Sequence, residues 1–329
     1  MTTSSDLLTR LPPPPAGKTG WPWTDDGYAA AQRTQLTAWP RFSVITPTFN
    51  RVALLEKTIR AVLLQHYPNL EYIVIDGGSR DGTVELLERY GEHIAYWVSE
   101  PDKNQADALN KGLRRCTGEI VAFINSDDFY LPGALRRVAQ LLVDHPEAAW
   151  ISGVVRYEDG EGNYLFSRQI PPLPAHRADW IDRWPTYQPA CFWRHVCFQR
   201  VGEFRVDLPY TFDTEFTIRL PFHGLFPLSV DEPFSVRVLH GETKQQTHPD
   251  IYPREAQRYY PDFARYLTPA EMPPFFWRQL RRRYGKARAR SLWEAYGEVA
   301  KAALRHPLWF WRGWRWWRQE EARRRTVTA

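Results

Sequence analysis

Glu119-Ile-Val-Ala-Phe-Ile-Asn-Ser-Asp-Asp128 is the stretch of sequence that decides the fold. Residues 120–124 form a short apolar run rich in β-branched and aromatic side chains, which predicts a buried strand. The run leads to two adjacent carboxylates, Asp127 and Asp128, which repel each other at a buried strand end unless a positive charge lies beside them. A divalent metal would supply that charge, and hard oxygen ligands suit Mg²⁺ or Mn²⁺. Alternatively, the two residues only begin the next helix, because Asp is favoured in first turns.

Strand-like and helix-like segments alternate on both sides of this stretch. The pattern predicts strands over residues 42–46, 70–75, 93–98, 119–124 and 148–157, and helices over 52–65, 81–90, 104–116 and 132–144. This β-α-β-α order predicts an α/β fold, a three-layer α/β/α sandwich with a mainly parallel central sheet.

The flanking segments are less regular. Residues 1–40 include prolines at 12–15 and predict an extended leader that lies over the main domain. Residues 158–190 predict an edge hairpin and loop, and the pattern after them predicts helices from 196 and 213 and a strand pair around 226–239. These changes of pattern place segment boundaries at 1–40, 41–150, 151–250 and 251–329, the last being a helical, basic extension.

Composition restricts the location of the protein. The 329 residues are 43% hydrophobic and 25% charged, as in an ordinary globular chain. Cys116, Cys191 and Cys197 lack metal-ligand spacing and indicate a reducing compartment. The N-terminus lacks the pattern of a signal peptide, and no stretch approaches the roughly 18 apolar residues of a spanning helix. We therefore expect a cytoplasmic protein, either soluble or bound peripherally to the inner face of the cell membrane.

Positive charge is concentrated near the C-terminus. Residues 278–329 contain 15 Lys and Arg against 4 Asp and Glu, whereas the formal net charge of the whole chain is +5. On a helix, residues 305–318 would place arginines on one half with Trp311 and five aromatic residues on the other, namely Arg305, Arg312, Arg315 and Arg318 opposite Trp309, Phe310, Trp314, Trp316 and Trp317. This pattern suits the surface of an anionic bilayer, and the alternative is packing against the protein itself or a partner chain. Without a reading module, the basic segment does not predict nucleic-acid binding.

Polar residues follow three of the predicted strands, in Thr46-Pro-Thr-Phe-Asn50, Asp76-Gly-Gly-Ser-Arg-Asp-Gly-Thr83 and Asn125-Ser-Asp-Asp128. The carboxyl ends of parallel strands converge on one crevice, where α/β folds bind phosphate-bearing ligands. Two glycines after Asp76 permit a tight turn and close backbone approach, although the segment also has the composition of an ordinary turn. In such a crevice Asp76 could accept a hydrogen bond from a base, Asp127 one from a ribose hydroxyl, and Asp128 could hold the metal.

Five stretches, in order, resemble the family-2 glycosyltransferases, which are inverting enzymes with the GT-A nucleotide-sugar fold. They are FSVITPTFNR (42–51), QHYPNLEYIVIDGGSRDGT (65–83), SEPDKNQADALNKG (99–112), GEIVAFINSDDFYLPGAL (118–135) and QPACFWRHVCFQRVGEFRVDLPYTFDTEFTIRL (188–220). The resemblance covers about residues 41–240. It implies a nucleotide-diphosphate-sugar donor, a divalent metal and a single displacement that inverts the anomeric centre.

The resemblance also implies roles for residues on the donor. By position, Thr46, Pro47 and Asp76 would flank the base, and Asp107 would lie near the ribose. Residues 41–150 would form the half that binds the nucleotide-sugar, and 151–250 the half that binds the acceptor.

Further residues are assigned to the diphosphate and the metal, Mn²⁺ or Mg²⁺. Asp127 would contact ribose or diphosphate, and Asp128 would ligate the metal. Two departures from the family pattern stand out. Asn125 replaces a common Asp, and Asn104-Gln105 replaces a common Gly and an aliphatic residue.

Asp213 and His240 complete the predicted site. Asp213 aligns with the catalytic base of the family, and the alternative is a helix N-cap. His240 follows a strand at the place where a family His can complete the metal or diphosphate site, and the alternative is a surface His.

The leading expectation is a metal-dependent, inverting, hexosyltransferase-type glycosyltransferase of cell-surface or extracellular polysaccharide synthesis. It would act on a hydroxyl of a glycan or of a lipid-linked acceptor. One alternative is transfer to a polyprenyl phosphate, which needs no strong base, so that Asp213 argues against it. The other is a non-catalytic nucleotide-sugar-binding or scaffold protein, against which the joint presence of Asp128 and Asp213 argues.

Overall fold

The computed structural model describes residues 5–182, 184–240 and 251–269, and beyond them 271–272, 276, 278–280, 300–301 and 304–318 apart from 306, 309, 316 and 317. The chain forms two compact units, one of residues 1–172 and 185–256 and one of residues 173–184 and 257–329. The polar segment 241–250 and most of the basic tail lie outside the described residues.

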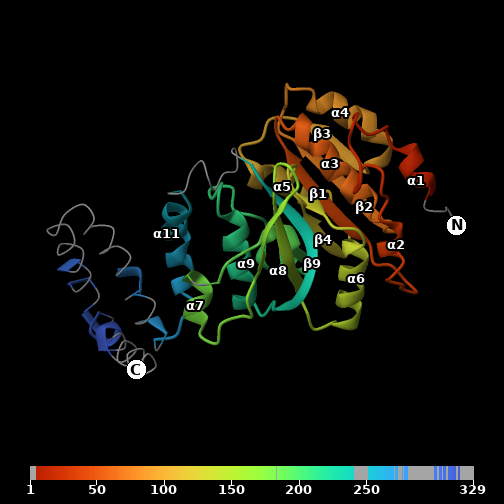
Figure 1. Cartoon of the computed structure of the whole chain (residues 1–329). Coiled ribbons are helices and arrows are strands. Elements are labelled where there is room, and N and C mark those ends of the chain that lie inside the picture. The colour runs from red at the N-terminus through yellow and green to blue at the C-terminus, as the bar shows by residue number, and fades with distance from the viewer. Residues whose placement is uncertain are drawn as a thin grey trace. The chain divides into compact units, whose positions relative to one another are not determined.

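The first unit is built on a mixed sheet, which within the described residues has nine strands in the order β3-β2-β1-β4-β8-β6-β9-β5, with β7 beside β6 (Figure 1). Strands β3, β2, β1 and β4 are parallel, whereas β8 pairs antiparallel with both β4 and β6. The strands are β1 (Phe42–Thr48), β2 (Leu70–Asp76), β3 (Tyr96–Ser99), β4 (Ile120–Phe123), β5 (Phe129–Tyr130), β6 (Trp150–Asp159), β7 (Tyr164–Gln169), β8 (Cys191–Arg194) and β9 (Pro227–Leu239).

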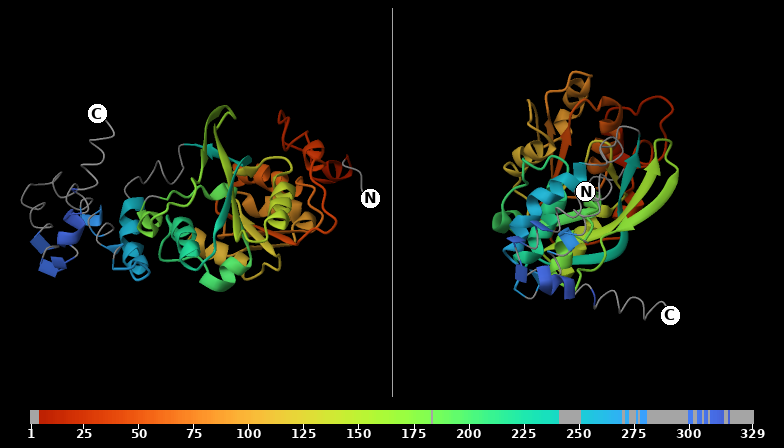
Figure 2. Two further views of the ribbon diagram at one scale, coloured as in Figure 1. Left: turned by 90° about the horizontal axis from the view of Figure 1, so that it is seen from below. Right: turned by 90° about the vertical axis from the view of Figure 1, so that its left-hand side faces the viewer.

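Helices cover both faces of the parallel strands, because side chains alternate along each strand. Val44 and Val74 pack in a cluster with residues of α3 (Val52–Leu63), α4 (Thr83–Tyr90) and α6 (Ala134–Asp144). Ile45 lies on the opposite face, against α5 (Gln105–Leu113), where Gly112 allows the helix to come close: a Cβ there would lie 2.6 Å from Ile45. The predicted α/β/α layering is therefore confirmed (Figure 2). The other described helices are α1 (Ser5–Arg10), α2 (Tyr28–Ala31), α7 (Arg177–Asp182), α8 (Val196–Val201), α9 (Phe212–Phe222) and α11 (Ile251–Ala264).

The carboxyl ends of the parallel strands lie at one edge of the sheet. Thr48 pairs with Asp76, and Asp76 pairs with Ser99, at the last residues of β1, β2 and β3. Strand β4 ends at Phe123, opposite Ile45, so the segment 125–128 follows at this same edge. The predicted convergence of the strand ends is confirmed.

Several predicted strands have different extents: β3 begins at Tyr96, three residues after the predicted start, and β6 is shifted by two residues. Strand β1 continues through Pro47. The backbone groups of Ile45 and Pro47 point toward β4, but the pairing with β4 ends at Phe123. Pro47 is therefore tolerated, because no backbone N–H is needed at this position. The predicted strand pair around 226–239 is wrong, because residues 227–239 form the single strand β9. Asp231-Glu232-Pro233 resembles a turn in sequence, but here it only shifts the register of β9 against β6.

A buried arginine fastens the N-terminal leader to the first unit. Arg60 of α3 is fully buried. Its guanidinium donates hydrogen bonds to the carbonyl oxygens of Pro12, Pro22 and Trp23 at 2.7, 3.0 and 3.1 Å, and to the Tyr90 hydroxyl at 3.2 Å. The leader is therefore an integral part of this unit.

We expect the substitution Arg60→Met to lower the free energy of unfolding by about 3 kcal/mol or more, because three carbonyl oxygens lose their donor in a buried site. Urea unfolding followed by tryptophan fluorescence measures the change. Arg33→Met is the matched control, since Arg33 is exposed in the same leader. Equal effects of the two substitutions would show that the contacts of Arg60 do not hold the leader.

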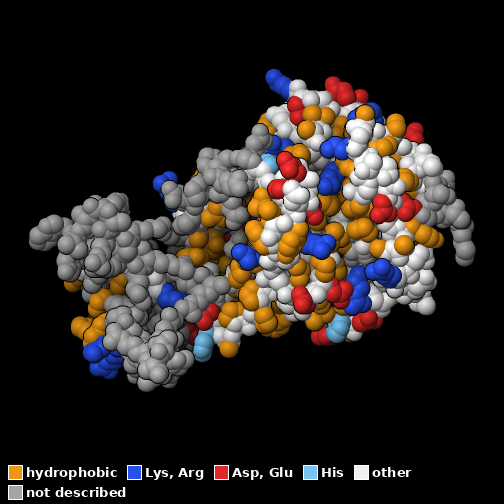
Figure 3. All heavy atoms as spheres, in the orientation of Figure 1, with side chains coloured by type: hydrophobic (Ala, Val, Ile, Leu, Met, Phe, Trp, Pro, Cys, Tyr) orange, Lys and Arg blue, Asp and Glu red, His pale blue; other side chains and the backbone are white. Residues whose placement is uncertain are grey.

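The two units differ in their charged residues. On the face in Figure 3, side chains of both charges are mixed with hydrophobic ones over the first unit. In the second unit Phe310 is buried while Trp311 is 58% exposed, and the arginines at 305, 312, 315 and 318 are exposed, as the helical pattern predicts.

Membrane contact of 305–318 stays a prediction, which flotation with anionic liposomes would test. None of the described helices is both long and apolar enough to cross a membrane.

Candidate active site

A cavity of about 560 Å³ opens at the carboxyl edge of the sheet within the first unit. Its size is that of a small-molecule site. Its walls come from the ends of β1 and β9, the start of α5, the segment after β4 and the start of α9. The polar and aromatic lining includes Thr48, Phe49, Arg51, Asp102, Gln105, Asn125, Asp127, Asp128, Thr186, Gln188, Tyr210, Asp213, Arg237 and Tyr252.

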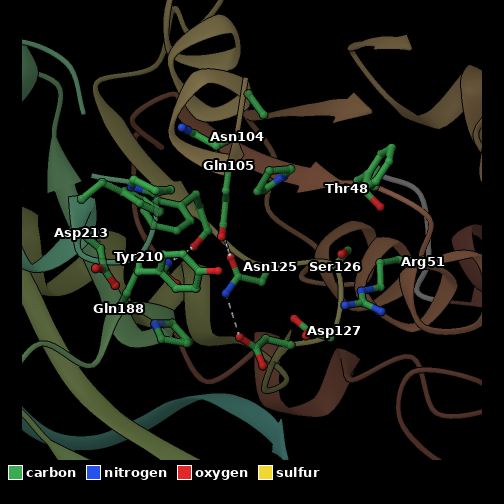
Figure 4. A pocket seen from close by; sticks show the side chains of 18 of the residues that line it. Thr48, Arg51, Asn104, Gln105, Asn125, Ser126, Asp127, Gln188, Tyr210 and Asp213 are labelled. Atoms are coloured by element: carbon green, nitrogen blue, oxygen red, sulfur yellow. Dashed lines mark hydrogen bonds between the residues drawn. The ribbon is translucent and has the colours of Figure 1, made fainter. Parts of the chain in front are cut away.

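The cavity has two sides, which Figure 4 shows. Thr48, Arg51 and Asp127 lie on one side, called here the β1 side. Tyr210 and Asp213 lie on the other, called the α9 side. A ligand that fills the cavity therefore meets basic and acidic groups at one end and a carboxylate beside an aromatic ring at the other.

Asp127 of the β1 side is in contact with His240. Asp127 follows β4 and His240 follows β9, and Asp127 Oδ2 lies 3.0 Å from His240 Nε2. Burial acts to raise the pKa of Asp127, but the contact with His240, a backbone hydrogen bond and the charge of Arg51 together outweigh it, and the net pKa is below its usual value. Asp127 is therefore charged at neutral pH and can offer a carboxylate oxygen to a cation.

Asp128, the next residue, is 2% exposed. Its Oδ1 accepts a hydrogen bond from Val238 N at 3.2 Å, and its Oδ2 accepts one from Asn125 Nδ2 at 3.3 Å. Burial, followed by the charge of Asp127, raises the pKa of Asp128 well above its usual value. Because Val238 is two residues before His240, Asp128 fixes the part of the chain that carries His240.

The Asp127–His240 pair fits a small divalent cation. Asp127 Oδ2 and His240 Nε2, which are joined here by a hydrogen bond of 3.0 Å, could also become neighbouring ligands of an octahedral ion, since such ligands lie about 3 Å apart at bonds of about 2.1 Å. A carboxylate with an imidazole suits Mn²⁺ better than Mg²⁺. Clusters of three or more His, Cys, Asp or Glu that could hold a metal are absent from the described residues. Phosphate and water oxygens would therefore supply the remaining ligands.

Asp213 is the carboxylate of the α9 side. Its Oδ1 accepts a hydrogen bond from Thr214 N at 2.7 Å, and no described residue donates to its Oδ2. Burial raises the pKa of Asp213, while the Thr214 contact and the charge of Arg237 partly oppose that rise. Asp213 can therefore accept a proton near neutral pH more readily than an ordinary Asp.

Arg237 supplies a half-buried positive charge that acts on both Asp128 and Asp213. It lies on β9 and lines the cavity. Burial opposes its charge, but Asp128 and Tyr157 among others raise its pKa, so it stays protonated. Arg237 is a single charged residue in the mostly apolar segment 234–239 of β9, and this pattern was a signal in the sequence for a buried or functional charge.

Asp76 does not line the cavity. It is fully buried, and its carboxylate accepts hydrogen bonds from the Ser79 hydroxyl, from Ser99 Oγ at 2.6 Å, and from the backbone N–H groups of Gly78 and Ser79 at 3.1 and 2.8 Å. Its oxygens are thus used to build the turn after β2, in which Gly78 has a φ of 85°.

Thr46 and Asp107 also lie outside the cavity lining, whereas Pro47 belongs to it. Thr46 is buried and accepts a hydrogen bond from the Tyr72 hydroxyl at 3.1 Å. Asp107 accepts one from Lys103 N at 3.1 Å at the start of α5.

The β1 side contains a cluster that the sequence-based assignment missed, formed by Phe49, Gly77 and Asp102. A Cβ added to Gly77 would lie 3.2 Å from the Phe49 ring and 3.3 Å from Asp102 Oδ2. Asp102 pairs with Lys111 at 2.6 Å, and Phe49 is 59% exposed. An exposed aromatic residue directly after a strand was the available signal. Nothing in the sequence pointed to Tyr252.

Residues 43–207 match the family model described as glycosyl transferase family 2. An uncharacterized glycosyltransferase of Mycobacterium tuberculosis is 30% identical over 189 residues, which is 56% of this chain and 70% of that protein. A putative teichuronic acid biosynthesis glycosyltransferase of Bacillus subtilis is 35% identical over 36% of this chain and 48% of its own length. A GalNAc(5)-diNAcBac-PP-undecaprenol beta-1,3-glucosyltransferase of Campylobacter jejuni is 40% identical over 31% of this chain and 34% of its own length.

Among solved structures, the fold is similar to that of a mannosyltransferase from Pyrobaculum calidifontis, in complex with GDP-Man and Mn²⁺. The TM-score is 0.57 at 22% identity, over 84% of this chain and 81% of that chain. TarS of Staphylococcus aureus is also similar, with a TM-score of 0.50 at 18% identity over 72% of this chain and 47% of that chain.

Proposed function

The chain belongs to glycosyl transferase family 2 and has the GT-A fold, and on this premise we propose that it is a metal-dependent, inverting enzyme that transfers a hexose from a nucleotide-diphosphate-sugar to an acceptor hydroxyl. The observation that carries the proposal is the placement of Asp127, which contacts His240, and of Asp213 on the two sides of one cavity. The first suits a diphosphate with its cation, and the second suits a base.

Asp127 and His240 would hold the cation. Asp128 would help to position His240 through its hydrogen bond with Val238 N. This changes the sequence-based assignment, in which Asp128 is the ligand and Asp127 contacts the ribose or diphosphate. The change is supported by a difference between the two carboxylates: both oxygens of Asp128 accept hydrogen bonds, whereas no hydrogen bond from another described residue reaches Oδ1 of Asp127. When bound, the cation offsets negative charge on the leaving diphosphate.

The nucleotide base would lie on the β1 side, between Pro47 and the cluster of Phe49, Gly77 and Asp102. Phe49 offers a ring face for stacking, and Asp102 Oδ2 offers an acceptor for a base N–H. The Asp76 carboxylate accepts hydrogen bonds within the turn that contains Gly77. It would therefore position Gly77 rather than contact the base.

Asp213 would accept the proton of the acceptor hydroxyl as that oxygen attacks the anomeric carbon. Its raised pKa and the lack of a donor to Oδ2 among the described residues support this role. Attack from the α9 side, with the diphosphate leaving toward the β1 side, is a single in-line displacement and inverts the anomeric centre.

The acceptor would be a growing cell-surface or extracellular glycan at the inner face of the membrane. The support is the described roles of two relatives, in teichuronic acid biosynthesis and in glucosyl transfer to an undecaprenol-linked glycan. Since the match spans about half or less of those two relatives, their activities come to this chain only as a proposal.

The proposal is tested by nucleoside diphosphate release from UDP-glucose, UDP-galactose, UDP-GlcNAc and GDP-mannose. We expect at least one donor to be hydrolysed slowly with Mn²⁺, and EDTA to abolish the release. A parallel titration with Mg²⁺ should show weaker stimulation, because an imidazole is a poor ligand for Mg²⁺. Failure of every donor to bind or react with Mn²⁺ present would overturn the proposed function.

A further inference from the structure

We propose that the α9 side binds a neutral sugar ring against Tyr210 and Tyr252, so that the acceptor reacts through a glycan hydroxyl and not through a lipid phosphate. The inference rests on the proposed function and names the acceptor class for the same cavity. It is carried by the aromatic walls, the polar groups and the charges of this side.

Two tyrosines from distant segments form the walls. Tyr210 precedes α9 and Tyr252 lies in the first turn of α11, and both line the cavity that contains Asp213. Their ring centroids are 6.1 Å apart with an angle of 72° between the planes. Two rings nearly at right angles form a corner whose faces suit the C–H surface of a sugar, since an aromatic face is electron-rich.

Glu255 holds this corner in place before any ligand arrives. Its Oε2 accepts hydrogen bonds from Tyr210 N at 3.0 Å and from Thr211 Oγ1 at 2.9 Å, and the side chain is buried. It therefore ties the first turns of α11 to the segment before α9. A pre-formed site loses less conformational entropy on binding.

Polar groups of the cavity lining match sugar hydroxyls. The Thr186 hydroxyl lines the cavity, is buried, and has no hydrogen-bond partner among the described residues. Burial and the nearby charge of Asp213 raise the pKa of Tyr252 to about 12, so its hydroxyl stays protonated and can donate. A buried hydroxyl without a partner is costly, and a sugar hydroxyl would satisfy it.

The charges of this side disfavour a phosphate. Asp213 would repel an anionic acceptor, and among the described residues that line the α9 side Arg237 is the cation. Arg237 already balances Asp128 and Asp213, which both feel its charge. A phosphate on the α9 side would therefore meet a carboxylate and a cation that is already balanced, the other cations of the cavity lining being Arg51 and Lys103, whereas a neutral ring needs no counter-charge.

The test compares two acceptor probes, with the donor that the hydrolysis panel selects and Mn²⁺. One probe is a set of p-nitrophenyl glycosides of glucose, galactose, mannose and GlcNAc, and the other is farnesyl phosphate. We expect transfer to at least one glycoside and none to the phosphate. Transfer to farnesyl phosphate alone would overturn the inference while leaving the glycosyltransferase function intact, whereas a chain that binds no donor would overturn both.

Variants then locate the acceptor. Tyr252→Ala should raise the acceptor KM about tenfold or more while the donor KM changes less, and Tyr252→Phe, which keeps the ring, should recover most of the loss. Tyr164→Ala is the matched control, because Tyr164 is exposed on β7. An unchanged acceptor KM in Tyr252→Ala would remove this ring from the acceptor site, and a donor KM that rises equally would assign it to the donor instead.

Discussion

Replacing Asp213 with Asn is expected to reduce sugar transfer by about 10²–10⁴-fold, the contribution of a positioned general base, while binding of nucleoside diphosphate and Mn²⁺ persists. The amide has the same shape, and its oxygen can still accept the hydrogen bond from Thr214 N that holds Asp213 now. What it cannot do is accept the proton of the acceptor hydroxyl. Initial rates of transfer, together with calorimetric titration of UDP or GDP, separate the two effects.

Asp144→Asn is the matched control, because Asp144 is exposed at the end of α6 and should leave turnover unchanged. The pH profile adds an independent readout. Burial raises the pKa of Asp213, and the base works only when deprotonated, so kcat/KM should fall with decreasing pH at a point above the ordinary Asp value of about 4. The remaining activity of Asp213→Asn should lack that fall. Near-normal turnover in the variant would mean that another group takes the proton.

The parallel part of the fold was predictable because each of its elements is specified locally. The alternation of apolar residues set the faces of β1 and β2, and the apolar run after Glu119 set β4. Parallel topology then required their carboxyl ends to meet, which they do from Thr48 to Ser99. The limits of β1 were less predictable, since Pro47 is tolerated only because β4 ends earlier.

The facing of individual side chains was not predictable in the same way. A carboxylate after a strand can point at a ligand or at its own turn, and Asp76 does the second. Tyr252 reaches the cavity because α11 returns to it, and Glu255 secures that return from 45 residues away. Neither fact leaves a local pattern. The different roles proposed for Asp127 and Asp128 depend on the hydrogen bond from Val238 N to Asp128, which joins residues 110 positions apart in the sequence.

Asp127→Asn is expected to weaken Mn²⁺-dependent nucleotide binding by more than about 100-fold, because a ligand of the cation is lost. Asp128→Asn should weaken the same binding by about 10–100-fold at most, as expected for a group outside the ligand shell. Asp127 is the charged carboxylate that meets His240 at 3.0 Å. Titration of UDP or GDP by calorimetry, with and without Mn²⁺, measures both variants, and binding in EDTA serves as the baseline for each.

The contrast between the two variants follows from what each carboxylate already does. Asp128 accepts hydrogen bonds from Val238 N and Asn125, and burial together with the charge of Asp127 raises its pKa. An Asn can replace a neutral acceptor there, and can keep the strand that carries His240 in place. Asp127 has the opposite tendency, since its lowered pKa shows that its position favours the charge. His240→Ala should resemble Asp127→Asn in direction, because it removes the other ligand. If Asp128→Asn were the more damaging change, the cation would lie against Asp128 instead, as the sequence-based assignment has it.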